Sequence, residues 1–188
     1  MSSQAFIQNL GPVDHASAQG AQREILDLAQ KQVGFIPNMY AMMANAPAVL
    51  STYVHGYSLF RTESGLTPPE QEVVLLAVSQ VNGCNYCTAA HSMIADKVSK
   101  VPADVLASIR HGKPIADPRL AALYDMAVEM VKTHGKPDAS VVKAFLDAGF
   151  EERALLYLVL AIAVKTLSNF TNHAFATPVD DRFAAYKV

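Results

Sequence analysis

Apolar residues recur every three or four positions along almost the whole chain, and no stretch alternates strictly between apolar and polar residues. The first spacing is typical of amphipathic helices, and strict alternation is typical of strands. A first helix is predicted over about 16–32, with three residues turned toward the core: Ile25, Leu26 and Leu28. The pattern predicts an all-α fold, a single helical-bundle domain over 1–188 with roughly eight helices.

The clearest helix start is Thr67-Pro68-Pro69-Glu70. It combines a capping Thr, prolines suited to the first turn and a Glu three residues after the cap. The helix that follows is apolar on nearly every side through Val81, so it should be central to the core. Asn82-Gly83 ends it, and the chain turns directly into a second helix that begins at Cys84. Residues 66–96 are therefore predicted to form a helix pair joined by a tight turn.

Hydrophobic residues make up 51% of the 188 residues, and charged residues make up 17%. This composition is apolar for a free monomer, so part of the surplus is expected in a subunit interface. The net charge of -2 comes without any dense Lys/Arg cluster, so nucleic acid is not an expected partner.

No membrane segment is expected. The longest charge-free apolar run, Ala154–Val164, is shorter than the roughly 20 residues that cross a bilayer, and we interpret it as a buried helix. The start of the chain, Met1–Phe6, has neither the cationic nor the apolar region of a signal peptide. A cytoplasmic protein is therefore expected.

The only two cysteines, Cys84 and Cys87, are the first candidates for chemistry. A disulfide between them would close a very small loop, so redox chemistry or metal binding explains the pair better than a structural staple. At helical spacing Cys84, Cys87 and His91 share one face. Unpaired N–H groups at a helix start stabilise a thiolate, and a nearby His can accept its proton. Glu72, on the preceding helix, either orients His91 or is a solvated partner of a basic residue.

Different roles for the Cys pair have weaker support. Zinc binding is the strongest of them, because both Cys and His91 could supply three ligands, with Glu72, water or another subunit as the fourth. Haem attachment needs a His directly after Cys87, where Thr88 stands. A thioredoxin-like site needs a βαβ setting that this sequence does not offer. Inert packing of two buried thiols is the remaining alternative.

The segment Leu66–His91 resembles the alkylhydroperoxidase AhpD-like family of the carboxymuconolactone decarboxylase superfamily, in particular its uncharacterised peroxidase-related branch. The family motif is a Glu on one helix, a Cys-x-x-Cys that opens the next, and a His after the second Cys. The similarity continues into Asn169–Asp180. Four residues match the motif in order and spacing: Glu72, Cys84, Cys87 and His91.

The resemblance implies an AhpD-like helical bundle that assembles into homotrimers or homohexamers. It also implies an enzyme that reduces hydroperoxides without a metal or an organic cofactor. In that cycle Cys87 attacks the peroxide and becomes a sulfenic acid, Cys84 resolves it to a disulfide, and Glu72 with His91 relays protons. An external dithiol of the lipoyl or thioredoxin type then restores both thiols.

One residue departs from the best-known branch of the family, which has a second His just before the second Cys. This chain has Tyr86 there, a poor base at neutral pH with a reference pKa of about 10. The relay is shortened to Glu72 and His91, so weak peroxidase turnover or a different substrate is expected.

The assignment of the two sulfurs rests on two opposed arguments. Cys84 lies nearer the helix start, which favours it as the more acidic thiol. His91, one helical turn from Cys87, favours Cys87 because it can remove the proton directly. Because His91 is the nearby base, we assign Cys87 as the sulfur that attacks the peroxide.

Two alternative functions stay open. One is a lactone decarboxylase, as in the other branch of the superfamily, which does not rely on a Cys pair. The other is a non-enzymatic oligomeric scaffold that senses redox state or holds zinc.

Overall fold

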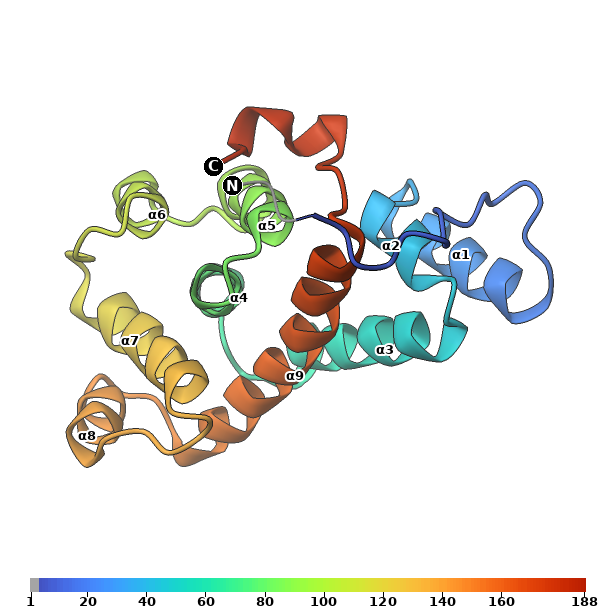
Figure 1. Ribbon diagram of the computed structural model, residues 1–188. Helices are drawn as coiled ribbons and strands as arrows, with labels where there is room; N and C mark the ends of the chain where they lie inside the picture. The colour runs from blue at the N-terminus through green and yellow to red at the C-terminus, as the bar shows by residue number, and fades with distance from the viewer. Residues whose placement is uncertain (1–3) are drawn as a thin grey trace.

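The computed structural model describes residues 4–188, which form nine α-helices and a final 3-10 helix without any strand (Figure 1). The all-α prediction is confirmed. The helices run over α1 Gly20–Val33, α2 Asn38–Met43, α3 Pro47–Glu63, α4 Pro68–Val81, α5 Asn85–Lys97, α6 Ala103–Arg110, α7 Pro118–Lys132, α8 Ala139–Asp147, α9 Glu152–Phe175 and η1 Asp181–Tyr186.

The predicted capping box opens α4. The Thr67 amide donates to Glu70 Oε2 at 2.8 Å, and the Glu70 amide donates back to Thr67 Oγ1 at 3.5 Å. Glu70 also accepts a hydrogen bond from Arg119 Nε on α7 at 2.9 Å. The cap therefore both begins α4 and ties it to α7.

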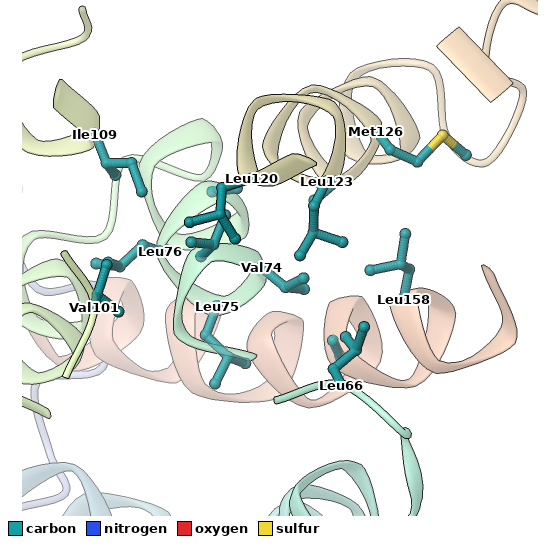
Figure 2. Close-up of a cluster of buried hydrophobic side chains, with 14 of the residues drawn as sticks. Leu66, Val74, Leu75, Leu76, Val101, Ile109, Leu120, Leu123, Met126 and Leu158 are labelled. Carbon is teal, nitrogen blue, oxygen red and sulfur yellow. The ribbon is translucent and has the colours of Figure 1, made fainter. Parts of the chain in front are cut away.

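The helix α4 is the centre of the bundle, as its apolar sequence predicts. The helices α5, α6, α7 and α9 all pack against it, and every residue from Val73 to Val78 is fully buried. Figure 2 shows this helix surrounded by apolar side chains of α7 and α9, among them Leu123 and Leu158. Full burial of one such Leu stabilises the fold by about 1.5–3 kcal/mol.

A second apolar cluster joins α1, α2 and α3 to α5, and both cysteines belong to it. Tyr57 of α3 and Leu160 of α9 pack against both clusters. The Cys pair therefore lies where the two halves of the core meet.

The helices α3 and α9 cross (Figure 1), and Gly56 of α3 lies against Val164 and Leu160 of α9. A Cβ at that position would lie 2.7 Å from Val164 Cγ1. Glycine in a helix interior costs about 1 kcal/mol relative to alanine, so the close crossing is the physical reason for it. The crossing brings the polar face of α9 against the Cys pair.

The first helix differs from its prediction. It begins at Gly20 rather than near Ala16, and its buried residues are Ile25, Leu26 and Ala29. The prediction that Leu28 points inward is wrong, because this side chain is 41% exposed. At 100° per residue, Leu28 lies roughly 100° from the centre of the face that the buried three define.

The long helix α9 continues well beyond the apolar run Ala154–Val164. Among the described helices, α9 alone is long and apolar enough to cross a membrane, yet 39% of its most apolar stretch is buried inside the protein. It packs against α2, α3, α4 and α5. The prediction of a buried helix holds for one face only, since Leu156 is 71% exposed on the other.

Candidate active site

The two cysteines stand at the turn between α4 and α5. Gly83 has a φ of 67°, a left-handed conformation that glycine adopts without strain, and it turns the chain into Cys84. Cys84 is the N-cap of α5, and its Sγ accepts a hydrogen bond from the Cys87 amide at 3.5 Å. Both thiols are free and buried. The local sequence thus holds two sulfurs within the first turn of one helix.

His91 and Glu72 form a buried pair beside them. His91 Nδ1 lies 2.9 Å from Glu72 Oε2, and the other carboxylate oxygen pairs with Arg61 of α3. Arg61 also donates to the Tyr57 hydroxyl at 2.5 Å. Glu72 therefore orients His91 and pairs with a basic residue at once, but it is buried and not solvated.

The protonation states of this pair follow from its surroundings. Burial raises the pKa of Glu72, but His91 and Arg61 outweigh it and hold that pKa below the ordinary value. Burial and the charge of Lys165 lower the pKa of His91, although Glu72 opposes them. A neutral imidazole that donates through Nδ1 keeps Nε2 free to accept a proton.

The helix α9 supplies three polar groups that the sequence motif does not contain. Asn172 Nδ2 donates to Cys87 Sγ at 3.2 Å, and the Cys87 thiol lies 3.8 Å from Ser168 Oγ. Lys165 is fully buried, and its Nζ has no hydrogen-bond partner among residues 4–188. An unpaired buried ammonium is costly to the fold, and this one lines the same cavity as the Cys87 thiol.

These contacts separate the acidities of the two thiols. The side-chain hydrogen bond between the two sulfurs, together with burial, raises the pKa of the Cys84 thiol far above its ordinary range. Burial also disfavours a thiolate at Cys87, but the hydrogen bond from Cys84 and the charge of Lys165 outweigh it. They hold the pKa of the Cys87 thiol well below its ordinary value. The arrangement favours a thiolate at Cys87 and a thiol at Cys84.

Cys87, His91 and Lys165 line one cavity of about 130 Å³. Most of its walls are apolar, and they include aromatic side chains from α2, α3, α5 and η1: Tyr40, Tyr53, Tyr57, Tyr86 and Phe183. Tyr86 is fixed in this wall because its hydroxyl donates to Asp180 Oδ2 at 2.5 Å. The position where the best-known branch has a second His is thus a structural aromatic here.

All four residues singled out in the sequence come together: Glu72 from the first half of α4, the two cysteines from the α4–α5 turn and the first turn of α5, and His91 from the middle of α5. Among residues 4–188, no group of three or more His, Cys, Asp or Glu side chains has a geometry that could hold a metal ion. Zinc binding would therefore require this group to rearrange.

Sequence reasoning missed the contribution of α3 and α9. Lys165 carries one signal, since it ends the charge-free apolar run of α9, where a charge has no reason to be in a core helix. The similarity over Asn169–Asp180 carries another, because it includes Asn172 and Asp180. Nothing in the sequence singles out Arg61.

Comparison with known families bears directly on these residues. Residues 47–129 match the sequence profile of the carboxymuconolactone decarboxylase family, and this segment contains Glu72, both cysteines and His91. The resemblance to the carboxymuconolactone decarboxylase family is confirmed over this segment. A comparison with curated protein sequences gives no match.

Solved structures confirm the AhpD-like fold. The alkylhydroperoxidase AhpD core of an uncharacterized peroxidase-related protein from Ralstonia eutropha JMP134 aligns with a TM-score of 0.80 at 23% identity, over 94% of both chains. An uncharacterized peroxidase-related protein from Silicibacter sp. TM1040 aligns with a TM-score of 0.72 at 20% identity, over 94% of this chain and 95% of that one. The debrominase Bmp8 in complex with 2,3,4-tribromopyrrole aligns with a TM-score of 0.78 at 14% identity, over 97% of both chains.

Proposed function

We propose that this AhpD-like chain is a thiol-dependent oxidoreductase that reduces hydroperoxides with Cys87 and Cys84. The observation that carries the proposal is the setting of Cys87. Its sulfur accepts a hydrogen bond from Asn172 at 3.2 Å and shares a cavity with His91 and Lys165. A nucleophilic sulfur, a base and a cation are the groups that thiolate attack on an O–O bond requires.

The proposed cycle balances with no metal or organic cofactor. The Cys87 thiolate attacks the terminal oxygen of the hydroperoxide, an S–O bond forms, and the O–O bond breaks. The leaving alkoxide takes the proton that His91 accepted when the Cys87 thiol ionised, and Cys87 becomes a sulfenic acid. The Cys84 thiol then attacks that sulfur, water leaves, and the disulfide forms. An external dithiol supplies the two electrons that restore both thiols.

Reductive debromination is a second candidate. The debrominase Bmp8 shares the fold and is known in complex with 2,3,4-tribromopyrrole. The cavity beside Cys87 is lined by aromatic side chains, which suit a flat ring. In such a reaction the two thiols are oxidised to the disulfide, a C–H bond replaces the C–Br bond, and hydrogen bromide leaves.

One assay tests both candidates. The reduced, metal-free protein is mixed with hydrogen peroxide, tert-butyl hydroperoxide or 2,3,4-tribromopyrrole, and the loss of free thiols is followed. The proposal expects both hydroperoxides to consume two thiols per chain much faster than they consume free cysteine. Faster loss with tribromopyrrole would favour the second candidate. Loss no faster than free cysteine with all three would sink both, and would leave a redox-sensing or zinc-holding scaffold or a lactone enzyme.

Variants test the roles of the two sulfurs in the same assay. Cys87→Ser is expected to be inert, and Cys84→Ser is expected to stop at a sulfenic acid that dimedone traps. His91→Ala is expected to slow the first step. If Cys84→Ser is the inert variant, the chemistry stands but the two sulfurs are assigned the wrong way round.

A further inference from the structure

The two sulfurs face different pockets. Cys87 lines the apolar cavity of about 130 Å³ described above, and Cys84 does not. Cys84 lines a separate pocket of about 500 Å³, which Cys87 does not reach. Tyr86 lines both pockets and lies between them, held by its hydrogen bond to Asp180.

The pocket at Cys84 has a different character from the cavity at Cys87. Its walls come from the α4–α5 turn, the end of α9 and the N-terminal segment at Phe6, and polar and apolar atoms line it in similar amounts. Asn172 and Thr177 both line it and are both more than nine-tenths buried. Asn172 Oδ1 and Thr177 Oγ1 have no hydrogen-bond partner among residues 4–188. Buried polar atoms are normally paired, so these two have unused hydrogen-bonding capacity beside this pocket.

We propose that this second pocket is the site where a reducing thiol enters and attacks Cys84, opposite the cavity through which the oxidising substrate reaches Cys87. The proposal rests on the proposed thiol oxidoreductase function. Reduction of the disulfide is assigned to the pocket at Cys84, and oxidation by the substrate is assigned to the cavity at Cys87.

The chemistry of thiol–disulfide exchange supports the same direction. The attacking thiolate forms a bond to Cys84 Sγ, the S–S bond breaks, and Cys87 leaves as a thiolate. Exchange is faster when the leaving sulfur is the more acidic one, and Asn172 together with Lys165 stabilises a thiolate at Cys87. The second thiol of the reductant then attacks the reductant sulfur that is bonded to Cys84 in the mixed disulfide. Cys84 is released and takes a proton, and the reductant leaves as a disulfide.

Two variants on α5 separate the pockets. Asn85 is exposed and lines only the pocket at Cys84, and Ala90 lines only the cavity at Cys87. Asn85→Trp narrows the pocket at Cys84, and Ala90→Leu narrows the cavity at Cys87. We expect Asn85→Trp to slow reduction of the disulfide by dithiothreitol at least tenfold and to leave oxidation by hydroperoxide within twofold of wild type. Ala90→Leu is expected to slow oxidation by hydroperoxide at least tenfold and to leave reduction by dithiothreitol within twofold of wild type.

The reductive half is measured independently of the proposed substrate. The disulfide is first formed with diamide, so the assay runs even if no hydroperoxide oxidises the protein. If the disulfide of Asn85→Trp is reduced as fast as that of wild type, the two-sided arrangement is wrong. It is also wrong if either variant slows oxidation and reduction to the same degree.

A second measurement needs no variant. Oxidised wild-type protein is treated with 2-mercaptoethanol, quenched with acid and digested, and the mixed disulfide is located by mass spectrometry. The proposal expects the adduct on Cys84. An adduct mainly on Cys87 would show that the reductant uses the other cavity.

Discussion

At the scale of single residues, the least expected feature is a lysine inside a core helix. Lys165 is fully buried and unpaired among the described residues, and it lines the cavity that holds Cys87 and His91. The best-known branch has a second His at the Cys pair, and this chain has Tyr86 instead. The positive charge beside the sulfur comes here from α9, a helix distant in sequence.

Lys165→Met should therefore make Cys87 less reactive and the fold more stable. Loss of the charge raises the pKa of the Cys87 thiol, because Lys165 is one of the groups that lower it. We expect alkylation of Cys87 by iodoacetamide at pH 7 to slow about tenfold. Because Nζ of Lys165 has no hydrogen-bond partner among the described residues, its replacement by an apolar side chain should raise the free energy of unfolding by about 1–3 kcal/mol.

Peptide mapping after alkylation and urea denaturation measure the two effects. Lys165→Arg is the matched control, since it keeps the charge and should preserve the pH profile of alkylation better than Met does. A Met variant that alkylates like wild type, or that loses stability, would mean that Lys165 has a structural role.

At the scale of elements, the position of α9 depends on its crossing with α3. Gly56→Ala gains about 1 kcal/mol in helix propensity, but its Cβ overlaps Val164 Cγ1 at 2.7 Å, and overpacking costs about 1–3 kcal/mol. We expect a net loss of up to about 2 kcal/mol in the free energy of unfolding. Because Lys165 follows Val164, displacement of α9 should also slow alkylation of Cys87.

A double-mutant cycle with Val164→Ala checks the cause. Removing the Val164 methyl groups makes room for the new Cβ, so Gly56→Ala should be neutral or stabilising in that background. Additive losses of stability in the double variant would place the cost of Gly56→Ala elsewhere.

At the scale of the whole molecule, stability should depend on pH through the buried His91. Burial and Lys165 hold the pKa of His91 in the folded protein below its value of 6.5 in the unfolded chain. Just below pH 6.5 the unfolded state thus binds more protons than the folded state. The contribution of His91 is complete above that pH, and it is lost as the pH falls toward the folded pKa. The urea midpoint of unfolding should therefore fall as the pH is lowered from 7.5 to 5.5, and it should fall less steeply in the His91→Gln variant.

The exposed residue His55 provides the control. In His55→Gln the urea midpoint should depend on pH as it does in wild type.

The exposed face of α9 supports the prediction of self-association. Leu156, Val159 and Phe170 are each more than half exposed and lie on one side of this helix. We expect light scattering to give a trimer or hexamer, and Leu156→Glu with Val159→Glu to reduce the mass. Leu28→Glu, on the exposed side of α1, should leave it unchanged. A wild-type monomer at micromolar concentration would contradict the expectation.

Much of this protein follows from local sequence. Helical periodicity, the capping box at Thr67 and the Asn82-Gly83 stop determine α4 and the start of α5, because caps and turns act within a few residues. The same short-range helix geometry brings Cys84, Cys87 and His91 onto one face of α5. Hence the fold class and the central motif could be predicted, but spacing alone left open whether Glu72 pairs with His91 or with a basic residue, and in the structure it pairs with both.

Only the tertiary structure decided what surrounds the two sulfurs. Lys165, Asn172 and Arg61 reach the site from α9 and α3, and their approach depends on the crossing at Gly56. Local spacing cannot show which of two neighbouring thiols is the more acidic, because burial and the charge of Lys165 on α9 act on that difference together with the hydrogen bond between the two sulfurs. Nor can it show that the sulfurs face separate pockets, since the walls of each come from helices far apart in the chain. Short-range hydrogen bonds and helix geometry placed the cysteines, and long-range packing gave each of them its own environment.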